Sequence, residues 1–253
     1  MATLSGIFDA ALTDRPALLV PFSTPALQVA VGKTRRGTPN VVFGMVANPV
    51  AAGAGRTYED HLAHITGISV RAPAPRMVDI LKRNFPQFKR VGTLFCPAEV
   101  NSVDLKEYFT SVAAAQGITV EAIAVNTPTE IADAALALAS SRIDAIVQIS
   151  DNISSSGFAA LTRAARSSRM PLISMNSLMI AQGAALAVGH DYHDVGIATA
   201  NRVQRVLAGE DPATIPFEQP TRIHFIVNTA NARATGLVLP ESLLKEAEKV
   251  ITD

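Results

Sequence analysis

Hydrophobic residues along this chain form short apolar runs that alternate with longer amphipathic stretches. Most runs are continuous, which is typical of parallel strands that are covered on both faces. They predict strands at residues 17–22, 40–46, 65–70, 90–96, 119–125, 145–149, 172–175, 184–188 and 224–227. Apolar residues at helical spacing predict helices at 25–34, 76–84, 101–116, 128–140, 157–166, 194–208 and 240–251.

The regular alternation of strand and helix predicts an α/β protein with parallel sheets built from βαβ units. With 253 residues, the chain is long enough for two such lobes of about 120 residues each. A polar stretch at 86–90 and a strand-to-helix junction at 188–194 indicate crossings between the lobes. The proline-rich segment 209–222 indicates a loop that returns to the first lobe. We therefore predict a first lobe of residues 1–88 and 192–253 and a second lobe of residues 89–191.

The composition excludes several classes of protein. Lys and Arg together number 22, as do Asp and Glu, and this balance without basic clusters argues against a nucleic-acid-binding protein. Hydrophobic residues make up 48% and charged residues 17%, which excludes a disordered chain. The single cysteine, Cys96, cannot form an intrachain disulfide and is predicted to be buried at a strand end.

No apolar run reaches the roughly 18 residues that a membrane-spanning helix needs. The first residues also lack the basic and apolar regions of a secretory signal. Two interpretations remain, a cytoplasmic protein or a sequence that begins after a removed segment, and the resemblance given below favours the second.

Motifs for nucleotide binding and catalysis are weak. The triplet Gly32-Lys33-Thr34 is similar to the end of a phosphate-binding loop, but Leu27 stands where that loop requires glycine. Neither a nucleophile elbow nor a close pair of carboxylates in a catalytic context is present. The sequence therefore predicts a protein that is not an enzyme and needs no cofactor.

Two histidine pairs have the spacing of metal ligands. His61 and His64 form one pair, and His190 and His193, beside Asp191 and Asp194, form the other. Neither pair has the distant third ligand that a zinc site requires. Because the second pair lies where a strand ends and a helix begins, we expect helix capping there and predict no metal site.

Polar residues gather directly after the predicted strands. In open α/β sheets, ligands bind at the carboxyl ends of the strands, against loops and helix N-termini. A helix N-terminus suits a carboxylate, and an aspartate such as Asp151 suits the ammonium group of the same ligand. The clusters in this position are Ser23-Thr24, Asn48, Asn101-Ser102 and Asp151-Asn152.

Several segments in order along nearly the whole chain carry a resemblance to a known family. They are NVVFGMVANPV at 40–50, ITGIS at 65–69, KRVGTLFCPAEVNS at 89–102, DAIVQISDN at 144–152, GAALA at 183–187, DYHDVG at 191–196 and IVNTANARATGL at 226–237. This pattern resembles the ABC-transporter substrate-binding proteins that include bacterial tryptophan- and tyrosine-binding proteins.

The resemblance implies the type I periplasmic-binding-protein fold, in which two Rossmann-like lobes are joined by crossover strands and hold the ligand between them. Carried over by position, the ligand-binding residues would be Ser23, Thr24 and Pro25 in the first lobe and Asn101, Ser102, Asp151 and Asn152 in the second. Further candidates are Asn48, Asn176 and Asp191.

The implied function is capture of a small amino-acid-like ligand, commonly aromatic, for the permease of an ABC importer. The implied location is the periplasm or a lipid-anchored position outside the cytoplasm. A ligand-sensing domain of a larger signalling receptor is the alternative. A repressor core is disfavoured because no helix-turn-helix precedes Phe8.

Two departures from the family pattern stand out. The first lobe lacks the initial strand, helix and strand that family members carry, so its sheet is expected to be short. A homodimer that exchanges strands would complete such a sheet. Phe22 stands where the family has a smaller residue, which bears on the identity of the ligand.

Overall fold

The computed structural model describes residues 3–252, which fold into two compact units. The first unit comprises Met1–Arg71 and Asp191–Thr221, and the second comprises Ala72–His190 and Arg222–Asp253. Neither unit is a continuous piece of chain, because the chain passes from one unit to the other after residues 71, 190 and 221.

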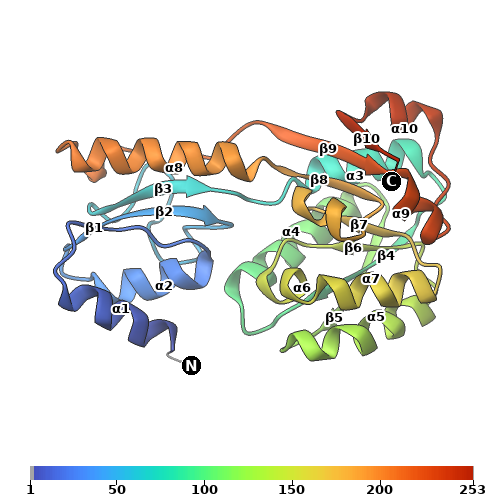
Figure 1. Cartoon of the computed structure of the whole chain (residues 1–253), viewed down its shortest axis with the longest axis horizontal. Helices are drawn as coiled ribbons and strands as arrows, with labels where there is room; N and C mark the ends of the chain where they lie inside the picture. The colour runs from blue at the N-terminus through green and yellow to red at the C-terminus, as the bar shows by residue number, and fades with distance from the viewer. Residues whose placement is uncertain (1–2, 253) are drawn as a thin grey trace. The chain divides into compact units, whose positions relative to one another are not determined.

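The first unit is built around a parallel sheet, called here the small sheet. Within residues 3–252 this sheet has three strands in the order β1-β2-β3. Helices α1 and α2 cover one face and α8 covers the other (Figure 1). The elements are α1 (Leu4–Thr13), β1 (Leu18–Leu19), α2 (Thr24–Lys33), β2 (Asn40–Val46), β3 (Ile65–Ser69), α8 (Tyr192–Leu207) and the 3-10 helix η3 (Pro212–Thr214).

Both faces of the small sheet are apolar. Val41 and Phe43 of β2 are fully buried in a cluster with residues of α1 and α2, whereas Val42 is buried with Val206 of α8. A strand covered on both faces needs apolar residues at successive positions. This requirement explains the continuous apolar run that predicted β2.

Strand β1 forms an edge of the small sheet within the described residues. It pairs with β2 through Leu18 and Leu19, and a single further bridge joins Phe22 to Gly44 of β2. Beyond the paired residues, Val20 and Phe22 remain 39% and 49% exposed. The chain therefore presents apolar side chains along this edge.

The second unit contains a larger sheet, called here the large sheet. Among the described residues it has seven strands in the order β10-β9-β8-β7-β6-β4-β5, and its pairings are parallel except that of β8 with β9. The strands are β4 (Arg90–Phe95), β5 (Thr119–Ala124), β6 (Ala145–Gln148), β7 (Leu172–Ser174), β8 (Leu186–His190), β9 (Ile223–Asn228) and β10 (Lys249–Ile251).

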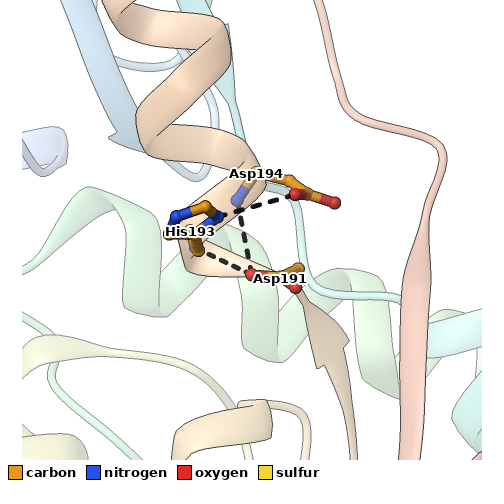
Figure 2. A group of neighbouring side chains, drawn as sticks. All are labelled: Asp191, His193 and Asp194. Carbon is orange, nitrogen blue, oxygen red and sulfur yellow. Dashed lines mark hydrogen bonds and ion pairs between the residues drawn. The ribbon is translucent and has the colours of Figure 1, made fainter.

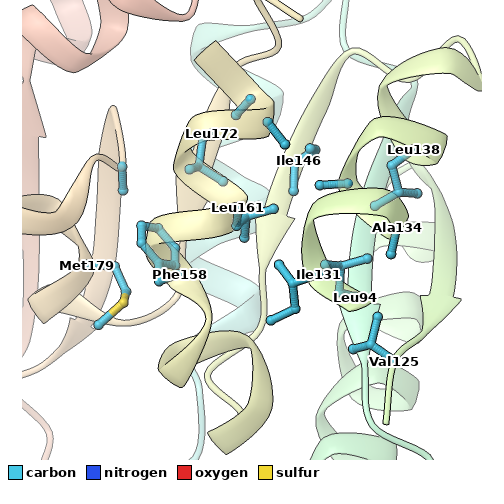
Figure 3. Packing of buried hydrophobic residues seen from close by; sticks show 14 of the residues in the cluster. Leu94, Val125, Ile131, Ala134, Leu138, Ile146, Phe158, Leu161, Leu172 and Met179 are labelled. Carbon is cyan, nitrogen blue, oxygen red and sulfur yellow. The ribbon is translucent and has the colours of Figure 1, made fainter. Parts of the chain in front are cut away.

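Helices pack on both sides of the large sheet. They are α3 (Ala74–Asn84), α4 (Val100–Ala115), α5 (Ile131–Ser140), α6 (Asn152–Ser156), α7 (Phe158–Ser167), α9 (Thr229–Ala234) and α10 (Glu241–Glu246), with 3-10 helices η1 (Pro128–Glu130) and η2 (Ser177–Gln182). Figure 3 shows one core, in which Ile131 of α5 and Phe158 of α7 pack near Leu94 and Ile146 of the sheet. This packing fixes where β4 and β6 end.

Each predicted strand corresponds to an observed strand, but the last predicted helix is wrong at its end. Helix α10 stops at Glu246, and Ala247 has an extended backbone. Residues Lys249–Ile251 then form β10, parallel to β9. Backbone pairing with β9 and the β-branched residues Val250 and Ile251 favour this strand over another helical turn.

Helices α1, α6 and α9 were not in the predicted set. The last two have only five and six residues, too short for a helical period to show in the sequence. None of the described helices combines the length and apolar character that crossing a membrane requires.

The division into units also differs from the predicted lobes. Residues 72–88 and 222–253 lie in the second unit, although the prediction placed them in the first, and Asp191 lies in the first unit, although the prediction placed it in the second lobe. Helix α3 packs on α4 and α10, and β9 pairs along its length with β8. These contacts between segments far apart in sequence hold both stretches in the second unit.

Candidate ligand-binding site

The order of the large sheet creates a switch point between β4 and β6. From β4 the chain continues to β5 on one side, and β6 then pairs on the other side. In open α/β sheets this point, at the carboxyl ends of the strands, is where ligands bind. The segments after β4 and β6 carry four predicted site residues, Asn101, Ser102, Asp151 and Asn152.

Ser102 and Asp151 connect the two segments directly. The Ser102 hydroxyl donates to Asp151 Oδ2 at 2.5 Å and accepts from the Cys96 N–H at 2.8 Å. Asp151 Oδ1 accepts from the Ser154 N–H at 2.7 Å and so caps α6. Two residues 49 positions apart are therefore brought together, as the prediction of a shared edge requires.

The Asp151 carboxyl is almost completely enclosed, with 2% of the residue exposed. Burial raises its pKa, against the opposing effect of the hydrogen bonds from Ser102 and Ser154. Ionisation of a buried carboxyl costs free energy, and a partner with positive charge reduces that cost. Asp151 therefore favours binding of a positively charged group.

Glu99 is a second acid at this edge, and the sequence prediction did not include it. Its Oε2 accepts from the backbone N–H of Asn152 at 3.3 Å and from the Asn152 side-chain amide at 3.2 Å. Burial is the largest cause that raises the Glu99 pKa, and the nearby charge of Asp151 adds to it. In the sequence, Glu99 is only an acid directly before the first turn of α4. Solvent-exposed acids are common at this position, so it does not indicate a binding site.

A chain of hydrogen bonds between buried polar side chains leads to Ser154, whose N–H donates to Asp151. The Ser174 hydroxyl donates to Gln148 Oε1 at 2.5 Å, and the Gln148 amide donates to the Ser154 hydroxyl at 2.9 Å. Asn176 follows β7, and its side chain accepts from the Leu178 N–H at 3.0 Å. The Asn176 side chain therefore stabilises the loop that contains it.

The predicted residues of the first unit gather at the carboxyl ends of β1 and β2. The Thr24 hydroxyl accepts from the Ala47 N–H at 3.2 Å, which joins the start of α2 to the segment before Asn48. Ser23 precedes α2 with a φ of 84°, and Pro25 lies in the first turn of that helix. Asn48 Oδ1 accepts from the Ala51 N–H at 3.0 Å.

Asp191 begins α8 together with His193 and Asp194 (Figure 2). Its Oδ1 accepts from the backbone N–H groups of His193 at 2.8 Å and Asp194 at 3.3 Å. Ligand atoms of the three side chains lie within 4.8 Å of one another, but the His193 side chain is 81% exposed. The expectation of helix capping is confirmed for Asp191.

The other predicted histidine pair contacts protein groups. The His61 ring stacks on Phe217 with a centroid distance of 4.6 Å, and His64 Nε2 lies 3.0 Å from the Thr34 hydroxyl. These contacts give the two histidines packing roles in the first unit.

The raised pKa of Glu99 predicts a pH-dependent difference in stability between the protein and its Glu99→Gln variant. In the folded protein Glu99 keeps its proton to higher pH than in the unfolded chain, so its contribution to folding is present below the ordinary glutamate pKa. That contribution is lost as pH rises through the folded pKa. The free energy of unfolding of wild type, minus that of the variant, should therefore fall with rising pH. Urea unfolding between pH 4 and pH 8 measures it, and a constant or rising difference would contradict the assignment.

The two α/β units have the fold of the type I periplasmic binding proteins. A sugar-binding protein from Bacillus halodurans shares this fold, with 13% sequence identity, a TM-score of 0.63 and coverage of 88% of this chain and 81% of that chain. The sequence matches the ABC transporter substrate binding protein family over residues 2–251. The chain belongs to this family.

Three further proteins are similar over most of the chain. A domain from Streptococcus pneumonia, solved in complex with L-Trp, is 30% identical with a TM-score of 0.92, and the match covers 98% of this chain and 83% of that one. A conserved domain protein from Vibrio cholerae is 26% identical with a TM-score of 0.92, covering 98% and 82%. A tyrosine-binding protein of Clostridioides difficile is 24% identical over 237 residues, 94% of this chain and 68% of that protein.

Proposed function

We propose that the protein binds a small amino acid with an aromatic side chain and delivers it to the permease of an ABC importer. The family membership supports the delivery role. The relatives described as bound to L-Trp and as tyrosine-binding support the class of ligand.

The observation that carries the proposal is the group of acids and amides at the switch point of the large sheet. Asp151 and Glu99 provide negative charge, and both have a raised pKa because of burial. The first turn of α4, which contains Asn101 and Ser102, provides the partly positive N-terminal end of a helix, of the kind that binds carboxylates, although the Ser102 N–H itself donates to the Glu99 carbonyl. An amino acid carries both of the complementary charges.

The first unit contributes the second group of proposed contacts. Ser23, Thr24 and Pro25 lie at the start of α2, with Asn48 following β2. Asn176 and Asp191 are proposed as further contacts.

In this role the protein acts outside the cytoplasm, in the periplasm or anchored to a lipid, and it returns its ligand chemically unchanged. Mass spectrometry of the amino acid after overnight incubation tests the last point. Conversion of the ligand to a product would show an enzyme.

Calorimetric titration with the standard amino acids tests the ligand class. We expect an aromatic amino acid to bind with a dissociation constant of about 10 µM or tighter. The Ser102→Ala variant should bind it at least about tenfold more weakly, because the bridge between the segments after β4 and β6 is lost.

Ser140→Ala is the matched control, since the exposed Ser140 hydroxyl donates to the Leu136 carbonyl within α5, away from the switch point. This variant should bind like wild type. A wild-type protein that binds none of the amino acids would refute the proposal. If Ser102→Ala bound the amino acid as tightly as wild type does, the switch point would not be part of the binding site.

A further inference from the structure

The two acids at the switch point differ in what they still offer a ligand. Asp151 accepts a hydrogen bond on each of its oxygens, from the Ser102 hydroxyl at Oδ2 and from the Ser154 N–H at Oδ1. Both oxygens of this carboxylate therefore already have a donor. With 2% exposure, Asp151 is committed to holding the two segments together.

Glu99 is only partly buried, and its interactions come from neighbouring amides. Asn152 donates to it from its backbone and its side chain. No ion pair joins Glu99 to a cation within residues 3–252. The Glu99 carboxylate therefore retains a charge that lacks a counterion in the described part of the chain.

Asn101 supplies a second, independent indication of a missing donor. The residue is 4% exposed, and its Oδ1 has no hydrogen-bond partner among the described residues. The same side chain lies close enough to Glu99 to lower the pKa of that carboxyl. Buried acceptors are nearly always satisfied in folded proteins, so an unsatisfied one at a ligand site indicates a donor that arrives with the ligand.

We propose that Glu99 and Asn101 form the subsite for the primary ammonium group of the ligand, and that Asp151 acts through Ser102 as a positioning residue. A primary ammonium group has three N–H donors, enough to bind one carboxylate oxygen and the Asn101 amide oxygen together. This inference rests on the proposed function and assigns the ammonium group to a different acid from the one predicted from sequence.

The assignment also limits which ligands bind. A compound that retains the side chain and carboxylate of the amino acid but lacks its amino group leaves Glu99 without a counterion and Asn101 Oδ1 without a donor. Such a compound should bind much more weakly than the amino acid, because its complex leaves polar groups of the binding site without a hydrogen-bond or ionic partner, which costs binding free energy.

The test compares L-tryptophan with indole-3-propionate, its analogue without the amino group, by calorimetric titration of wild type and Glu99→Gln. If another standard amino acid binds wild type more tightly, that amino acid and its deamino analogue are used. We expect Glu99→Gln to bind the amino acid about 30-fold or more weakly than wild type does. Its affinity for the analogue should stay within about threefold of the wild-type value, because the analogue has no group that contacts Glu99.

Glu107→Gln is the matched control, since Glu107 lies on α4, which begins directly after Glu99, and its side chain is 67% exposed. It should bind both compounds as wild type does, and circular dichroism confirms that each variant is folded. Equal affinity of Glu99→Gln and wild type for the amino acid would overturn the inference alone, as would an equal loss for both compounds. Failure of wild type to bind any standard amino acid would overturn the proposed function together with this inference.

Discussion

Replacing Arg202 with alanine should lower the free energy of unfolding by about 2–4 kcal/mol. The Arg202 guanidinium lies between α8 and the small sheet, with its side chain 8% exposed. It donates to the Thr66 hydroxyl at 3.1 Å and to the Pro216 carbonyl at 2.5 Å, and it forms an ion pair with Glu218. Its removal takes a donor from the buried Thr66 hydroxyl and also removes the packing of its aliphatic stem.

Arg205 on the same helix provides the matched control. It forms a bidentate pair with Glu210, but its side chain is 47% exposed. Since an exposed ion pair contributes little, Arg205→Ala should lower the free energy of unfolding much less than Arg202→Ala does. Urea unfolding followed by circular dichroism measures both variants, and equal losses of stability would refute the role assigned to Arg202.

Replacing Gly67 with alanine should destabilise the first unit by about 3 kcal/mol or more. Gly67 lies in β3 opposite Phe43 of β2, with a φ of 157°. An added Cβ would lie 2.3 Å from the Phe43 carbonyl oxygen and 2.6 Å from Phe43 Cγ. The nearest obstacle is backbone, so the strands must separate to accommodate a methyl group.

Gly32→Ala tests whether the effect belongs to the site or to the loss of any glycine. Gly32 lies in α2 of the same unit, and an added Cβ there meets nothing within 4 Å. Because alanine favours helix, this variant should be as stable as wild type or more stable by up to about 1 kcal/mol. A Gly67→Ala variant with wild-type stability in urea unfolding would show that β2 and β3 can separate at little cost.

The strands could be predicted from the sequence because a strand that is buried on both faces needs a continuous apolar run, such as the one that forms β2. The end of the last helix was not predictable in the same way. Leu243, Leu244 and Val250 keep a helical spacing, but the extended backbone at Ala247 and the pairing with β9 decide the outcome. Pairing between distant segments leaves no periodic signal in either of them.

The candidate site, like the fold, could be predicted from the sequence only in part. Polar residues after strands were visible in the sequence, and the adjacency of β4 and β6 brings Ser102 to Asp151. What each group contacts could not be foreseen, because hydrogen bonds depend on how the two loops fold against each other. Thus Glu99 was missed, although it accepts two bonds from Asn152.

The interleaving of the two units along the chain has a consequence for proteolysis. Three crossings, after residues 71, 190 and 221, connect the units covalently. A protease that cleaves one crossing leaves two others intact, so the nicked protein stays in one piece under native conditions. Separating the units requires scission at all three crossings, and expression of either unit as a contiguous fragment would demand an artificial linker.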